Sequence, residues 1–119
     1  MSMDERQRKL VANEATFRDA NERIRDAATS FRFRGDQRVP FLCECSDPDC
    51  HETVMLALSD YEEIRAHPER FLLVAGHEDE DVQTERIIET ERGYAVVEKL
   101  GEAGAEAARL QQHRPGRSA

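Results

Sequence analysis

The sequence predicts an α+β domain: a long N-terminal helix and a short second helix packed on a small, mainly antiparallel sheet. Three observations lead to this prediction. Apolar residues recur every three or four positions in the first thirty residues. Several short runs rich in β-branched and aromatic residues follow. Glycine, proline and acidic residues separate these runs, as is typical of turns between antiparallel strands.

The first thirty residues predict a single helix over residues 4–30. One side of this helix forms an apolar stripe, which we expect to pack on the protein's own sheet; a partner-binding or dimer face is the alternative. The stripe consists of Phe17, Ala20, Ile24, Ala27 and Phe31. The opposite side carries Arg18, Glu22, Arg25 and Asp26. Residues 30–38 hold three arginines and two phenylalanines, and we interpret them as a connector whose aromatic rings tuck under the helix.

The next elements are predicted from strand and turn patterns. Residues 39–44 and 54–58 indicate two strands of a hairpin, with residues 47–49 as its turn. Ser59 and Glu62 fit a capping box that opens a short helix, and Pro68 ends it.

Three further strands and a tail complete the predicted order. Residues 71–75 form a strand, and residues 84–90 and 94–99 form a hairpin around Gly93, which tolerates a positive φ. From Gly101 the chain is rich in alanine and glutamate and weakly helical. We therefore expect a flexible N-terminus over residues 1–12, one domain over residues 13–104, and a weakly helical to disordered tail over residues 105–119.

Composition limits the classes of function. The chain has 119 residues, enough for one domain, and a formal net charge of −8. No apolar run approaches the roughly 20 residues of a membrane span, and the N-terminus lacks the apolar stretch of a secretion signal. We expect a cytoplasmic protein with no membrane contact, in which cysteines stay reduced.

The acidic charge is concentrated in the middle of the chain. Residues 44–91 hold three basic and fifteen acidic residues, a net charge of −12. Such a face repels phosphate backbones, so we do not expect it to bind nucleic acid. A basic protein partner is the better electrostatic match. Residues 78–81 are four consecutive acids without the spacing or glycine of a calcium loop, and we interpret them as a solvated loop.

All three cysteines lie within eight residues, in a Cys-x-Cys-x4-Cys pattern at Cys43, Cys45 and Cys50. Clustered cysteines in a reducing compartment favour a metal over a disulfide. Zn²⁺ takes four ligands in a tetrahedron, and thiolates and imidazoles supply them well. The pattern predicts a zinc knuckle at the tip of the hairpin. Three cysteines are one short of the usual iron–sulfur set.

The fourth ligand is predicted to be His77, which follows a strand and a glycine in an irregular segment. His51 is the second choice, since its neighbour Cys50 already occupies the site and adjacent side chains rarely reach one ion. His67 lies at a predicted helix end, and His113 lies in the tail.

The favoured function is a non-catalytic interaction or regulatory module that zinc stabilises. A zinc–thiolate redox switch is the first alternative, because thiolates can be oxidised and release the metal; a disulfide, for which Cys45 and Cys50 are the easier pair, belongs to the same class. The second alternative is a zinc hydrolase with an open metal position. Its base would be Glu44, Glu52 or Glu78.

At the knuckle, at Gly76-His77-Glu78 and again at residues 93–99, the sequence resembles a family of small uncharacterised bacterial proteins, mainly actinobacterial. The similar layout extends from Asn13 to Gly104. The resemblance implies a compact α+β domain in which the three cysteines are paired with His77. It implies no activity.

Overall fold

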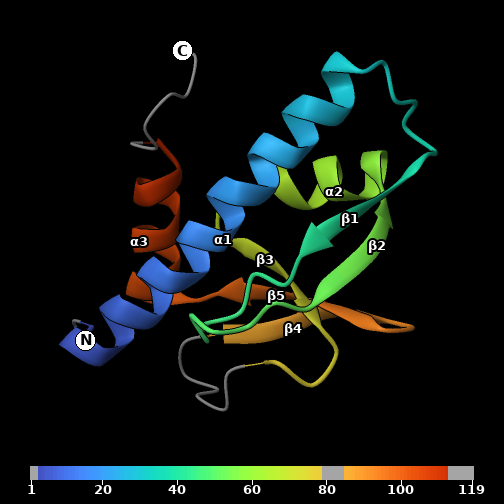
Figure 1. The fold of residues 1–119 in the computed structure, drawn as a ribbon. Coiled ribbons are helices and arrows are strands. Elements are labelled where there is room, and N and C mark those ends of the chain that lie inside the picture. The colour runs from blue at the N-terminus through green and yellow to red at the C-terminus, as the bar shows by residue number, and fades with distance from the viewer. Residues whose placement is uncertain (1–2, 79–84, 113–119) are drawn as a thin grey trace.

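The computed structural model describes residues 3–78 and 85–112, which form three helices and five strands (Figure 1). The helices are α1 (Glu5–Ser30), α2 (Leu58–Arg65) and α3 (Gly101–Gln112). The strands are β1 (Arg38–Leu42), β2 (Thr53–Ala57), β3 (Arg70–Val74), β4 (Glu85–Glu91) and β5 (Tyr94–Lys99). The predicted α+β class is confirmed. The antiparallel strands are divided between two sheets, β1-β2 and β3-β5-β4.

Helix α1 crosses the molecule, and α3 lies beside its N-terminal half (Figure 1). A capping box opens α1: Asp4 accepts a hydrogen bond from the Gln7 backbone N–H (2.7 Å), and the Asp4 N–H donates to the Gln7 side chain (3.1 Å). A Schellman motif ends it, in which the N–H of Phe33 donates to the carbonyl of Ala28 at 2.9 Å. Arg32 occupies the left-handed position of this motif with φ 61°.

The predicted apolar stripe of α1 does not form the buried face. Phe31 is 79% exposed, Ala27 is exposed, and the other three stripe residues are only partly buried. The fully buried face lies roughly a third of a turn away and is largely polar. It consists of Val11, Glu14, Ala15, Arg18, Asn21, Glu22 and Ala28.

Arg18 shows why α1 is oriented in this way. Its guanidinium donates to the carbonyls of Pro68 (2.6 Å) and Ala107 (2.8 Å) and lies 4.8 Å from the centre of the Phe71 ring. These contacts give both terminal nitrogens of the buried guanidinium a partner, although the sequence pattern predicts Arg18 on the exposed side.

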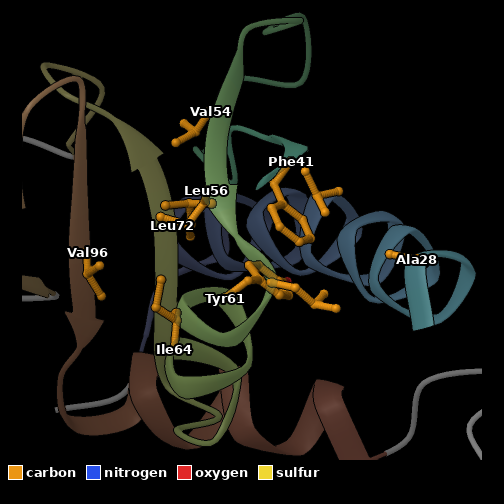
Figure 2. Close-up of a cluster of buried hydrophobic side chains, with 10 residues drawn as sticks. Ala28, Phe41, Val54, Leu56, Tyr61, Ile64, Leu72 and Val96 are labelled. Atoms are coloured by element: carbon orange, nitrogen blue, oxygen red, sulfur yellow. The ribbon is translucent and has the colours of Figure 1, made fainter. Parts of the chain in front are cut away.

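The β1-β2 hairpin is confirmed, with Val39 opposite Leu56 and Phe41 opposite Val54. These four side chains are buried, whereas the alternate residue Met55 is exposed. They belong to a cluster with Tyr61 and Ile64 of α2, Leu72 of β3 and Val96 of β5, and Figure 2 shows Phe41, Val54 and Leu56 beside these residues. The Phe41 and Tyr61 rings are stacked, with their centroids 4.2 Å apart. One core therefore joins both sheets.

The predicted capping box at Ser59 is wrong. Helix α2 begins at Leu58, and no side chain caps it. Instead, the connector before β1 supplies carbonyls: the N–H of Leu58 donates to Gln37, and the N–H of Ser59 donates to Gly35, both at 2.9 Å. Distant backbone thus satisfies the free N–H groups of the helix end.

The rings in residues 30–38 do not tuck under α1. Phe31 and Phe33 are both exposed, whereas Ala28, Val39 and Phe41 are the buried residues of the core near this end of the helix.

A second core lies between the β3-β5-β4 sheet and the two long helices. It contains Val11 of α1, Phe71 and Leu73 of β3, Val97 of β5, and Ala103 and Ala107 of α3. The limits predicted for the domain, residues 13 and 104, fall inside α1 and α3. In the described ranges, no helix is both long and apolar enough to cross a membrane.

Candidate metal centre

The structure brings Cys43, Cys45, Cys50 and His77 together. Their ligand atoms all lie within 4.8 Å of one another. The cysteines belong to the knuckle (residues 43–50), which follows β1, and His77 belongs to the segment that follows β3. His51, the alternative fourth ligand, is exposed and is not a member of this group.

Two of the distances between the ligand atoms match the edges of a zinc tetrahedron. With Zn–S bonds of about 2.3 Å and a Zn–N bond of about 2.0–2.1 Å, a sulfur and a nitrogen ligand lie about 3.5–3.6 Å apart. Nδ1 of His77 lies 3.5 Å from Sγ of Cys43 and 3.6 Å from Sγ of Cys50. These two edges therefore have the length that the ion requires.

Extended backbone places the first two sulfurs on one side of the chain. The N–H of Cys43 donates to the carbonyl of Glu52 (3.0 Å), and the N–H of Glu44 donates to the carbonyl of Leu72 (2.7 Å). Alternate side chains of an extended segment share a side, so Cys43 and Cys45 face the site together and Glu44 faces away. The tight Cys-x-Cys spacing follows from this local conformation.

A side-chain turn returns the third cysteine. The Asp47 carboxylate accepts from the N–H of Asp49 (2.9 Å), and the Asp47 carbonyl accepts from the N–H of Cys50 (3.1 Å). An Asx-turn of this kind reverses the chain within a few residues. The predicted turn at residues 47–49 is confirmed.

The histidine is presented by a second turn. Gly76 has φ 94°, which favours glycine, and the N–H of His77 donates to the carbonyl of Val74 at 3.0 Å. Val74 also donates its N–H to Sγ of Cys43 at 3.2 Å, so β3 contacts the site directly.

The three sulfurs differ in exposure. Cys43 and Cys45 are buried, Cys50 is partly buried, and the His77 side chain is 28% exposed. Burial raises the pKa of the Cys43 thiol, an effect that the Val74 N–H partly offsets and that nearby Cys45 increases. Burial raises the pKa of Cys45 as well. Such thiols ionise readily only beside a cation, and a bound metal supplies one.

The glutamates considered as a catalytic base occupy three different settings. Glu44 is fully buried away from the sulfurs. Glu52 places a carboxylate oxygen 2.8 Å from Nε2 of His77. Glu78 accepts from the N–H of Gly76 at 3.2 Å. A shallow depression of about 290 Å³ lies beside the site, lined by Cys45, Ser46, Asp47, Gly76, His77 and Glu78.

Sequence reasoning missed the network around Glu44. Its Oε2 accepts from the Asn21 amide (2.8 Å) and the Tyr61 hydroxyl (2.7 Å). Its Oε1 accepts from the N–H of Leu72 (2.9 Å) and lies 3.4 Å from the Arg65 guanidinium. The one available indication was a charged residue directly after an apolar strand.

Comparison with models of protein families gave no match, and no curated protein and no solved structure matched the chain either. The resemblance to a bacterial family therefore stays a prediction. What the chain shows by itself is an α+β fold with a Cys3His group that could hold a metal ion such as zinc.

Proposed function

We propose that the protein binds one zinc ion through Cys43, Cys45, Cys50 and His77, and that this ion is structural. The observation that carries the proposal is the convergence of three sulfurs and one imidazole nitrogen within 4.8 Å, with two sulfur–nitrogen distances of tetrahedral length. Four protein ligands complete the usual coordination of zinc, which is the composition of a structural rather than a catalytic site.

The ion would join two parts of the fold. The cysteines extend the β1-β2 hairpin, and His77 follows β3 of the other sheet. Zinc would thus tie the hairpin tip to the second sheet. In a small domain, the free energy of binding such an ion adds directly to the free energy of unfolding.

The protein would act as an interaction or regulatory module in the cytoplasm, with a basic protein as partner. Supporting this choice, a depression of about 390 Å³ beside Tyr94 is lined by four acidic residues and one basic residue, Arg70. The acidic residues are Asp60, Glu63, Glu89 and Glu91. Slight desolvation of this exposed side chain, a side-chain hydrogen bond with Glu91 and the negative charges of Glu91 and Glu63 raise the pKa of the Glu89 carboxyl. The raised pKa indicates local negative charge that a cationic partner would offset. We also propose that the protein is a member of the small bacterial family that its sequence resembles.

A thiol switch is the second candidate function, and the partial exposure of Cys50 favours it. Hydrogen peroxide would transfer one oxygen to the Cys50 thiolate, which becomes a sulfenic acid, and the other oxygen would leave as hydroxide. Attack by a second cysteine thiolate on that sulfur would then form a disulfide, expel hydroxide and free the zinc. Peroxide-driven zinc release that a reductant reverses would favour this candidate over a purely structural ion.

The first experiment measures metal content by elemental analysis of protein purified under reducing conditions. Wild type and His51→Ala should each hold about one zinc per chain, and His77→Ala should hold less or lose it during dialysis. His51 is the matched control, because it is a histidine next to the knuckle and outside the Cys3His group. A metal-free wild type, or zinc loss in His51→Ala alone, would contradict the proposal.

A further inference from the structure

Glu52 contacts two of the zinc ligands at once. Its carbonyl accepts the backbone N–H of Cys43 at 3.0 Å, and its carboxylate lies 2.8 Å from Nε2 of His77. The residue stands just before β2, whose first residue, Thr53, is paired with Leu42 of β1. The hairpin register therefore fixes where this carboxylate stands.

The two ring nitrogens of His77 face different partners. Nδ1 lies near the sulfurs of Cys43 and Cys50, and Nε2 lies near the Glu52 carboxylate. A neutral imidazole carries one proton, and the nitrogen that binds a metal must keep its lone pair. With Nδ1 toward the ion, the proton belongs on Nε2. There the N–H can donate a hydrogen bond to the carboxylate.

We infer that Glu52 is a positioning residue for His77: it selects the Nε2–H tautomer, fixes the ring orientation and raises the basicity of Nδ1. The inference rests on the proposed zinc site. Carboxylates that accept from the second nitrogen of a metal-binding histidine act in this way, and their loss typically weakens metal binding about 10–100-fold. A catalytic base would need its carboxylate directed at a bound water, whereas Oε2 of Glu52 lies 2.8 Å from Nε2 of the ring.

Neighbouring acids do not duplicate the contact in the described part of the chain. Glu78, one residue after His77, has its carboxylate on the Gly76 N–H at 3.2 Å. The Asp47 carboxylate accepts from the N–H of Asp49 in the knuckle turn. The Glu52 side chain is itself 60% exposed, so its replacement leaves no cavity in the core.

The test compares Glu52→Ala and Glu52→Gln with wild type and with Glu62→Ala, which removes an exposed glutamate on α2. Zinc affinity is measured by competition with a chelator of known affinity at fixed pH. We expect Glu52→Ala to bind zinc about 10–100-fold more weakly, Glu52→Gln to lie between it and wild type, and Glu62→Ala to match wild type.

A second readout separates positioning from general destabilisation. Nitrogen-15 NMR of the zinc-loaded protein should show wild-type His77 with the proton on Nε2, and the Nε2–H should exchange with water faster in Glu52→Ala. The melting temperature of the metal-free protein should be the same in both, because Glu52 acts through the bound histidine.

The outcomes distinguish this inference from the proposal on which it rests. Wild-type zinc affinity in Glu52→Ala, together with zinc loss in His77→Ala, would overturn the positioning role and leave the site intact. A wild type without zinc would overturn the site itself. If Glu52→Ala destabilised the metal-free protein as much as the zinc-loaded protein, that result would also contradict the inference. It would show that Glu52 stabilises the fold independently of the metal site.

Discussion

Glu44 stands between two proposed zinc ligands, yet its partners come from three other elements of the fold. Asn21 belongs to α1, Tyr61 and Arg65 belong to α2, and Leu72 belongs to β3. A buried carboxylate without partners would destabilise the fold strongly, whereas both oxygens of this one face hydrogen-bond donors or a cation. Glu44 thus connects the knuckle to helices α1 and α2 and to strand β3.

The Tyr61 hydroxyl gives this network a pH dependence. Burial raises the pKa of Tyr61 well above its ordinary value of about 10, and the negative charge of Glu44 adds to the effect. Above pH 10 the unfolded chain loses this proton and the folded protein keeps it. The folded state then binds more protons, so the free energy of unfolding falls as the pH rises.

Tyr61→Phe should remove that dependence while keeping the ring stacked on Phe41. Near neutral pH the variant should be about 1–3 kcal/mol less stable, because Glu44 loses a donor. Above about pH 10 this difference should shrink by up to about 1.4 kcal/mol per pH unit. Urea denaturation of both proteins from pH 7 to 11 measures it, and a difference that stays constant or grows would refute the assignment.

At the scale of the element, the end of α1 is the least favourable piece of backbone that we identify. Arg32 adopts φ 61° at a position that glycine usually occupies, and exposed phenylalanines stand on either side of it. A residue with a Cβ loses roughly 1–2 kcal/mol in this conformation.

Arg32→Gly should therefore raise the free energy of unfolding by roughly 0.5–1 kcal/mol, after allowance for the greater freedom of glycine in the unfolded chain. Arg32→Ala is the matched control, since it removes the same side chain and keeps the Cβ; it should bring no gain. The urea midpoint should shift with an unchanged slope. A glycine variant no more stable than the alanine variant would count against the backbone explanation.

An element can be predicted from the sequence when the interactions that determine it are local. The β1-β2 hairpin was predictable because alternation at Val39, Phe41 and Val54 and a polar turn lie within twenty residues. The buried face of α1 was not, because Arg18 is buried through carbonyls fifty and eighty-nine residues away. The start of α2 was missed for the same reason, since its caps are carbonyls of a preceding loop.

The same difference between local and distant causes applies to the residues of the candidate site. The cysteine pattern is local and gave three members, and the glycine before His77 pointed to the fourth. Glu52 was considered only as a base, because its contact with His77 depends on how the hairpin lies against the segment after β3. Its proximity to the histidine has no counterpart in sequence spacing.

At the scale of the whole molecule, zinc is expected to stabilise a fold made of two sheets. If free zinc exceeds its dissociation constant a thousandfold, binding adds about 4 kcal/mol to the free energy of unfolding. For a domain of this size, each kcal/mol shifts the melting temperature by roughly 3–6 °C. Chelation of wild type should thus lower it by at least about 10 °C.

Cys50→Ser should lower the melting temperature similarly, and adding chelator to this variant should cause little further change. Ser46→Ala, which alters the knuckle without removing a ligand, should still respond to chelator as wild type does. Thermal unfolding followed by circular dichroism, with metal content verified for every sample, makes the comparison. An unchanged melting curve after verified zinc removal from wild type would show that the ion contributes nothing to stability.

The alternation of Cys43, Glu44 and Cys45 also protects the chain against errors of folding. A slip of this segment by one residue would exchange its two sides. The Glu44 carboxylate would then lie among the metal-binding sulfurs. The cysteine sulfurs would lie beside the Arg65 guanidinium and the Tyr61 hydroxyl, which contact Glu44 in the native register. The misaligned chain would lose a metal ligand on one side and leave a buried cation without its anion on the other. These three consecutive residues thereby make the native register of the hairpin more stable than a register shifted by one residue.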